Sequence, residues 1–162
     1  WGLLDKWAVH LGGGLTHRLT RNDALMIKEN DLASMGDSDD GNEKKIAELI
    51  QSLDLSQLES FIEIEVRNEK EAITAAAMWQ QTHQGIEGKL VVMLDNFGPE
   101  RCKEMVAQLE DMGLRNAVLL EASGNITFET LDEWFECGVD VISTSAINRG
   151  VKPLDISMIV GD

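Results

Sequence analysis

The stretch Leu90-Val-Val-Met-Leu-Asp95 decides the fold, because an unbroken apolar run ends there directly on a carboxylate. Such a run is typical of a strand that is buried on both faces, as in a parallel sheet. Other apolar runs also end on polar or small residues, and helix-like stretches separate them: Phe61-Ile-Glu-Ile-Glu65, Ala117-Val-Leu-Leu-Glu121 with Ala122-Ser-Gly124 behind it, and Asp140-Val-Ile-Ser-Thr-Ser145. The pattern predicts a β/α barrel with its chemistry at the C-terminal ends of parallel strands.

Periodicity and capping residues assign the remaining elements. Asn68 is expected to cap a helix, Pro99 to sit in the first turn of the next, and Thr127 to cap a third that reaches Phe135. An exposed loop is expected at 37–41 and a short extended or helical segment at 153–159. Helices are expected at 1–9, 42–53, 68–83, 99–112 and 127–135, and strands at 23–28, 61–66, 90–94, 117–120 and 141–144.

Composition narrows the class of protein. The chain has 162 residues, of which 43% are hydrophobic, which suits one domain over 1–162. Its net charge of −15 argues against nucleic-acid and anionic-membrane partners, although a local cationic cluster can still bind an anionic small molecule. Cys102 and Cys137 lack metal or disulfide-framework spacing, which is typical of reduced thiols in a cytoplasmic protein. No run has the length of a transmembrane helix, and no signal peptide is seen.

Glu65 and Asp95 are the first candidate site residues, because each ends a predicted strand. Two carboxylates at one barrel mouth can hold Mg²⁺ through water or hydrogen-bond sugar hydroxyls. The alternative interpretation is that Asp95 begins a turn and that Glu65 is a solvated edge residue.

Two further groups suit anionic ligands. The Ser123-Gly124-Asn125 turn before the expected helix could bind phosphate through backbone N–H groups, or it could be an ordinary strand–helix connection. His17 and Arg18, which follow a triple glycine, and Lys28, which ends a predicted strand, could clamp a dicarboxylate. The alternative for these three is a basic surface loop.

Taken together, the motifs resemble one family, the quinolinate phosphoribosyltransferases. The similar stretches follow the family's order over essentially the whole chain: Lys6-Trp-Ala-Val9, Gly12-Gly-Gly14 with His17-Arg18, Asp23-Ala-Leu-Met-Ile-Lys-Glu-Asn30, Ile62-Glu-Ile-Glu-Val66, Met93-Leu-Asp-Asn96, Leu120-Glu-Ala-Ser-Gly124, Gly138-Val-Asp-Val-Ile-Ser143 and Leu154-Asp-Ile156.

The resemblance implies an α/β fold, an incomplete (open) β/α barrel of the type II phosphoribosyltransferase kind that lacks the family's N-terminal domain and first barrel strand. It implies transfer of phosphoribosyl from phosphoribosyl pyrophosphate to quinolinate with decarboxylation, giving nicotinate mononucleotide, pyrophosphate and CO₂ in NAD biosynthesis. It further implies Mg²⁺ as cofactor and a cytoplasmic homodimer or higher homo-oligomer. We expect sequence to precede Trp1 and the fragment alone to be inactive.

The same resemblance implies roles for individual residues. His17, Arg18 and Lys28 would line the quinolinate pocket, and Lys28, Glu65 and Asp95 would be catalytic. Glu65 and Asp95 would also face the ribose hydroxyls and Mg²⁺. The residues expected to bind phosphoribosyl pyrophosphate are Glu65, Asp95, Ser123, Gly124, Asn125, Ser145 and Arg149.

Some positions depart from the family pattern. Asn125 replaces the second glycine of the Ser-Gly-Gly turn, and Ser145-Ala-Ile-Asn-Arg149 stands where the family has Gly-Ala-Leu-Thr-His. Two alternatives therefore remain open: a related phosphoribosyltransferase that acts on nicotinate or another pyridine, and a non-catalytic barrel fragment.

Overall fold

Parallel strands form the framework of the chain. The computed structural model describes residues 2–20, 23–36, 41–57, 60–86, 89–149 and 155–159. Its sheet has five strands in the order β1-β2-β3-β4-β5, and every neighbouring pair is parallel: β1 (Leu25–Ile27), β2 (Ile62–Val66), β3 (Leu90–Asp95), β4 (Leu119–Ser123) and β5 (Val141–Ser143). The predicted α/β class and parallel order are confirmed.

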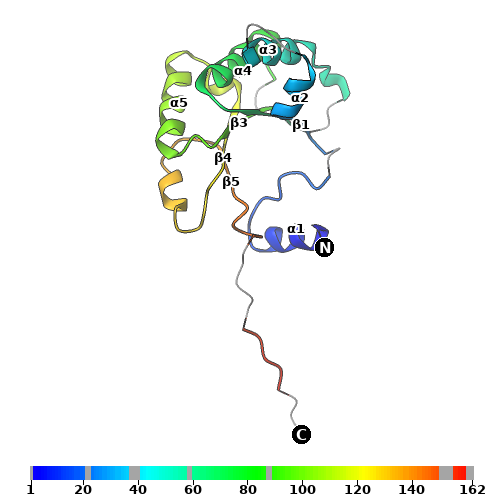
Figure 1. Cartoon of the computed structure of the whole chain (residues 1–162), viewed down its shortest axis with the longest axis vertical. Helices are drawn as coiled ribbons and strands as arrows, with labels where there is room; N and C mark the ends of the chain where they lie inside the picture. The colour runs from blue at the N-terminus through cyan, green and yellow to red at the C-terminus, as the bar shows by residue number, and fades with distance from the viewer. Residues whose placement is uncertain are drawn as a thin grey trace.

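Helices cover one side of this sheet. They are α2 (Glu29–Ser34), α3 (Gly41–Ser52), α4 (Glu69–Thr82) and α5 (Pro99–Asp111). Figure 1 shows them wrapped around the sheet, while α1 (Gly2–Leu11) lies apart from this layer. The apolar side chains of β3 and the helices form the core, in which Trp79, Met105 and Leu109 are fully buried. The described part of α1, in contrast, has no buried residue.

Local sequence explains where the main helices begin. Asn68 Oδ1 accepts a hydrogen bond from the backbone N–H of Glu71 at 3.0 Å and so caps α4. Pro99 occupies the first turn of α5, where its missing N–H costs nothing. Both predictions are confirmed.

The expected helix over 127–135 is wrong. Only a short 3₁₀ turn, Leu131–Trp134, forms there. The backbone N–H of Thr127 donates to the hydroxyl of Thr130 at 3.1 Å, and the carbonyl of Thr130 accepts from Glu133 at 3.1 Å. Local hydroxyl-to-backbone bonds of this kind compete with a regular helix. The buried Trp134 then fixes the turn against the core.

Other observed elements differ from the expected ones by smaller amounts. The strand expected at 117–120 lies at Leu119–Ser123, because Arg115–Ala117 is a 3₁₀ turn. The sequence analysis missed α2, in which Leu32 is buried and Asp31 accepts a hydrogen bond from the backbone N–H of Lys28 at 2.8 Å. Residues 155–159 form neither helix nor strand, and the expected loop at 37–40 and residues 153–154 lie outside the described residues.

Two further features concern the cysteines and the lengths of the helices. Cys102 and Cys137 are both buried and free, and burial raises the pKa of the Cys102 thiol to about 12, so this thiol is inert at neutral pH. Among the residues that the structure describes, no helix has the length and apolar character needed to cross a bilayer.

Candidate functional site

The inner face of the sheet carries polar side chains toward the ends of its strands. On β2 the apolar residues Ile62, Ile64 and Val66 are buried in the core, and alternation therefore turns Glu63 and Glu65 to the other face. Glu65 pairs with Met93 on β3, so Asp95 lies on the same face two residues farther along that strand. At that level Asp95 pairs with Ser123 on β4, and Ser123 pairs with Ser143 on β5. Carboxylates and hydroxyls thus gather at one edge of the sheet.

Lys28 joins the carboxylates at this edge. Its Nζ donates to Glu65 Oε2 at 2.8 Å, and Arg67 Nη2 lies 3.9 Å from Glu65 Oε1. The hydrogen bond to Glu65 is the main cause that raises the pKa of Lys28, and the charges of Glu63 and Asp95 act in the same direction. The structure therefore brings together the three residues predicted to be catalytic, Lys28, Glu65 and Asp95.

His17 lies against two buried carboxylates. Its Nε2 is 2.6 Å from Glu63 Oε2 and 3.9 Å from Glu121 Oε2, and its backbone has a φ of 52°. The close contact with Glu63 is the main cause that raises the pKa of His17. Burial raises the pKa of Glu121, to which the hydroxyl of Ser143 donates a hydrogen bond.

The His17, Glu63 and Glu121 side chains also offer ligand atoms within 4.8 Å of one another. The 2.6 Å separation between His17 Nε2 and Glu63 Oε2 is that of a close ion pair. Two ligands of one ion, each about 2.1 Å from it, would lie farther apart. The arrangement is therefore that of an ion pair rather than of a metal site.

Arg18 points to strand β1. Its guanidinium donates to the carbonyl of Ala24 at 3.4 Å and contacts Met26 Sδ at 3.3 Å. Met26 pairs in register with Glu63, so Arg18 and His17 reach the same layer of the sheet. Within the described residues, no carboxylate pairs with Arg18. Its charge is therefore available to an anionic ligand.

The turn after β4 is built around a close approach to the turn after β3. Gly124 has a φ of 101°, and a Cβ atom there would lie 2.3 Å from Asn96 Oδ1. Asn125 Nδ2 donates to the same oxygen at 2.9 Å. Only glycine fits at position 124 without displacing Asn96.

The segment after β5 lies beside this turn. The hydroxyl of Thr144 donates to the carbonyl of Ile126, and the backbone N–H of Arg149 donates to the carbonyl of Ser145 at 2.8 Å. Ser145 and Arg149 are exposed. The expected helix dipole behind Ser123 is absent, so phosphate binding here would depend on backbone N–H groups and side chains.

The sequence analysis did not assign Glu63 or Glu121 to the site. Both are almost fully buried, and neither carboxylate oxygen of Glu63 accepts a hydrogen bond of ordinary geometry among the described residues. A signal was present in each case: Glu63 shares a face with Glu65, and Glu121 follows an apolar run. Buried carboxylates in a barrel interior are costly and call for a functional explanation.

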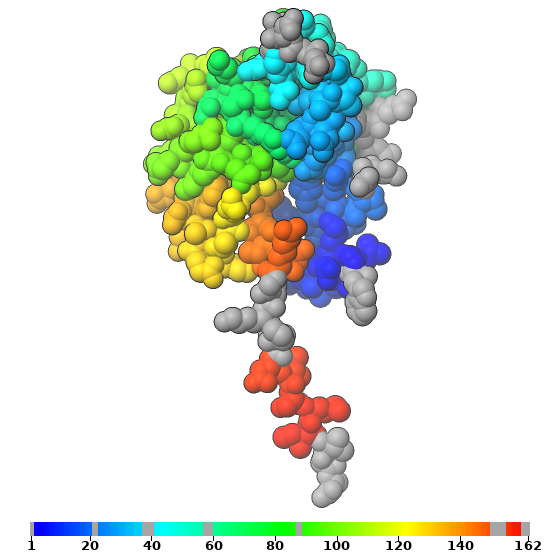
Figure 2. Space-filling model, in the orientation of Figure 1, coloured from blue at the N-terminus to red at the C-terminus, as the bar shows by residue number. Residues whose placement is uncertain are grey.

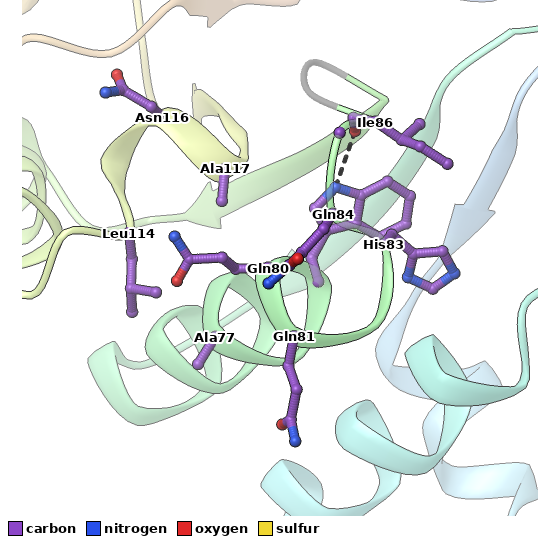
Figure 3. A pocket seen from close by; sticks show the side chains of 11 residues that line it. Ala77, Gln80, Gln81, His83, Gln84, Ile86, Leu114, Asn116 and Ala117 are labelled. Atoms are coloured by element: carbon purple, nitrogen blue, oxygen red, sulfur yellow. Dashed lines mark hydrogen bonds between the residues drawn. The ribbon is translucent and has the colours of Figure 1, made fainter.

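A hollow lies at the opposite end of the sheet, between the C-terminal end of α4 and the segment that precedes β4. Figure 3 shows Gln80, Gln81 and His83 around it, together with Leu114 and Asn116. Trp79 Nε1 donates to the carbonyl of Ile86 at 3.2 Å, and the Trp79 ring stacks on His83. This hollow is lined by amides and a stacked histidine and lies far from the C-terminal ends of the strands. We therefore interpret it as a structural feature of the fold and not as a reaction site.

The parallel sheet, its helical cover on one side and its polar strand ends define this chain as part of an open α/β barrel. A family model described as "Quinolinate phosphoribosyl transferase, C-terminal domain" matches residues 2–159. The chain belongs to this family.

Relatives of the chain carry names consistent with this family. A protein of Methanothermobacter thermautotrophicus, named a probable nicotinate-nucleotide pyrophosphorylase (carboxylating), is 33% identical over 95% of this chain and 50% of its own length. The chloroplastic nicotinate-nucleotide pyrophosphorylase (carboxylating) of Arabidopsis thaliana is 35% identical over 96% of this chain and 44% of its own length. The chain spans about half the length of the curated relatives it matches.

Solved structures agree on the fold. The nicotinate-nucleotide pyrophosphorylase from Francisella tularensis superimposes with a TM-score of 0.66 at 34% identity, over 93% of this chain and 46% of that chain. NadC from Streptococcus pyogenes gives a TM-score of 0.67 at 27% identity, over 91% of this chain and 45% of that chain.

Proposed function

We propose that this chain is the barrel domain of an enzyme that transfers phosphoribosyl from phosphoribosyl pyrophosphate to quinolinate. The observation that carries the proposal is the cluster of Lys28, Glu65 and Asp95 at the strand ends of a domain of this family. The names of the relatives, which describe quinolinate phosphoribosyltransferases and carboxylating pyrophosphorylases, support the same reaction.

The reaction exchanges one bond for another at the ribose. The pyridine nitrogen of quinolinate forms a bond to the anomeric carbon as the bond from that carbon to pyrophosphate oxygen breaks. The carboxyl group next to the nitrogen then leaves as CO₂, and a proton replaces it on the ring carbon. Positive charge builds on the ribose in the first step, and carboxylates fixed beside it, such as Glu65 and Asp95, would stabilise that charge.

The cationic residues suit the other substrate. Quinolinate carries two adjacent carboxylates, and burying them without cationic partners would be costly. Arg18, which has no carboxylate partner among the described residues, would bind one carboxylate in a bidentate manner, with His17 beside it. Lys28, held by Glu65, would lie between this pocket and the ribose.

The phosphate of the sugar would lie at the turns after β4 and β5. Gly124 allows the backbone to approach closely there, and the segment after β5 adds hydroxyls and a guanidinium. The residues proposed to bind phosphate are Ser123, Gly124, Asn125, Ser145 and Arg149.

Glu65 and Asp95 also fit Mg²⁺, because both offer hard oxygen ligands at neighbouring strand ends. Glu65 already accepts a hydrogen bond from Lys28, whereas Asp95 is free of hydrogen bonds and ion pairs within the described part of the chain. Asp95 would therefore be the principal ligand, with Glu65 acting through water. The bound ion would neutralise charge on the departing pyrophosphate.

We further propose a homodimer or higher homo-oligomer in the cytoplasm. Leu3, Leu4, Trp7 and Leu11 of α1 are exposed, which favours a covering partner surface. The buried free thiols suit a reducing compartment. Light scattering of the natural polypeptide that contains these residues would test the oligomer, and a monomer at micromolar concentration would contradict it.

Asp95→Ala tests the proposed site. In the natural polypeptide that contains these residues, the substitution should lower kcat by on the order of 100-fold or more, while the circular dichroism spectrum stays unchanged. The exposed Asp132→Ala serves as the control and should leave kcat intact. Unchanged turnover of Asp95→Ala at saturating phosphoribosyl pyrophosphate would reject the assignment.

A further inference from the structure

Glu63 is the least expected group in the molecule. Its side chain is completely buried, its Oε2 lies 2.6 Å from His17 Nε2 in an ion pair, and neither of its oxygens accepts a hydrogen bond of ordinary geometry among the described residues. An ionised group in such a place costs several kcal/mol unless a cation compensates it. His17 is the cation that the structure supplies.

The imidazole is held from several directions. Glu63 approaches from β2 and Glu121 from β4, and the ring of Phe61 meets it edge-on with centroids 5.6 Å apart. Lys6 of α1 fixes the backbone on both sides, because its Nζ donates to the carbonyls of Thr16 and Arg18. These contacts hold His17 at its positive φ, a conformation that costs free energy and is common at functional sites.

We propose that Glu63, assisted by Glu121, is a positioning residue that keeps both ring nitrogens of His17 as N–H donors and thereby turns Nδ1–H toward the substrate. This inference rests on the proposed function for the identity of that substrate. With its proton on Nε2, beside Glu63, a neutral imidazole would present a lone pair at Nδ1 and repel a carboxylate. The charged ring presents a donor instead.

The charges around the ring support this role. Glu63 and Glu121 are the acids that face His17, and Arg18 is the opposing cation. The attraction of Glu63 outweighs the burial of the ring and the charge of Arg18, which both lower the pKa of His17, because that pKa is raised. Burial raises the pKa of Glu121, which lies 3.9 Å from His17 Nε2, so Glu63 is the principal partner of the ring. The side chain of His17 keeps 29% of its surface exposed, so the ring remains accessible on the side away from Glu63.

Nuclear magnetic resonance of the His17 ring nitrogens tests the positioning without any substrate. In the wild-type natural polypeptide, both nitrogens should be protonated at pH 6.5 and the midpoint should lie above 6.5. Glu63→Gln should lower the midpoint by about one unit or more, a tenfold change in the protonation equilibrium. Glu121→Gln should lower it less, because Glu121 is farther away. Glu63→Asp should restore part of the shift, and the exposed Glu104→Gln should change nothing. An unchanged midpoint in a folded Glu63→Gln variant would overturn the proposal.

Calorimetry then tests whether the positive charge of His17 contributes to quinolinate binding. Glu63→Gln should weaken quinolinate binding about tenfold at pH 8 and less at pH 6, where His17 is charged in either protein. Binding of phosphoribosyl pyrophosphate should be unchanged. Equal weakening at both pH values, or of both ligands, would indicate a merely structural role and overturn the proposal. If the wild-type protein does not bind quinolinate at all, the proposed function fails, while the resonance experiment still decides the positioning.

Discussion

Gly124→Ala should damage the site more than an ordinary glycine substitution does. An alanine at a φ of 101° costs about 1–2 kcal/mol from the backbone conformation alone. Its Cβ would also lie 2.3 Å from Asn96 Oδ1 and 3.0 Å from the backbone nitrogen of Asn96. Asn96 must then move, which breaks its hydrogen bond to Asn125 at a cost of about 0.5–1.5 kcal/mol. Shifting the backbone adds about 1–3 kcal/mol.

Gly113→Ala is the matched control. Gly113 also has a positive φ, 68°, but a Cβ atom there meets nothing within 4 Å. Urea unfolding should therefore show a loss of about 1–2 kcal/mol for Gly113→Ala and about 1.5–4.5 kcal/mol more for Gly124→Ala. Gly124→Ala should also weaken phosphoribosyl pyrophosphate binding in the natural polypeptide, and Gly113→Ala should not. Equal losses of stability in the two variants would refute the argument from close approach.

Three other predictions concern single side chains. Arg18→Lys should weaken quinolinate binding by about 1–3 kcal/mol in calorimetry, because lysine cannot form the bidentate contact; equal weakening of both substrates would make Arg18 a surface residue. Asn68→Ala should lower the free energy of unfolding by about 1 kcal/mol through loss of the α4 cap, whereas the exposed Asn116→Ala should not. Because the folded pKa of His17 is raised, its pair with Glu63 stabilises the fold fully below pH 6.5, and this contribution is lost as pH rises through the folded value. His17→Asn removes the imidazole and keeps a residue that tolerates positive φ. The difference in free energy of unfolding between wild type and this variant should shrink as the pH rises, and a constant difference from pH 6 to 9 would contradict the argument.

The sequence predicted the framework well, because strands buried on both faces have a strong signature. The run from Leu90 to Asp95 became β3, and Asn68 and Pro99 marked the starts of α4 and α5. The helix expected after Thr127 failed because hydroxyl-to-backbone bonds at Thr130 competed with it, a balance that periodicity does not show. The short helix α2 was missed because its only buried side chain is Leu32.

The site was predictable in part, because residues at the ends of predicted strands can be read from the sequence. Strand-end position suggested Glu65 and Asp95, and the family resemblance grouped Lys28 with them; the structure shows the hydrogen bond from Lys28 to Glu65. The partners of His17 were not predictable, because Glu63 and Glu121 come from strands that are not neighbours in the sheet. Only the folded register shows that one imidazole reaches both.

The most direct measurement follows quinolinate labelled in the carboxyl group next to its ring nitrogen. The natural polypeptide that contains these residues should release labelled CO₂ only when phosphoribosyl pyrophosphate and Mg²⁺ are present. One nicotinate mononucleotide and one pyrophosphate should form for each CO₂, and nicotinate should not replace quinolinate. Absence of labelled CO₂ with both substrates present, or turnover of nicotinate in place of quinolinate, would contradict the proposed reaction.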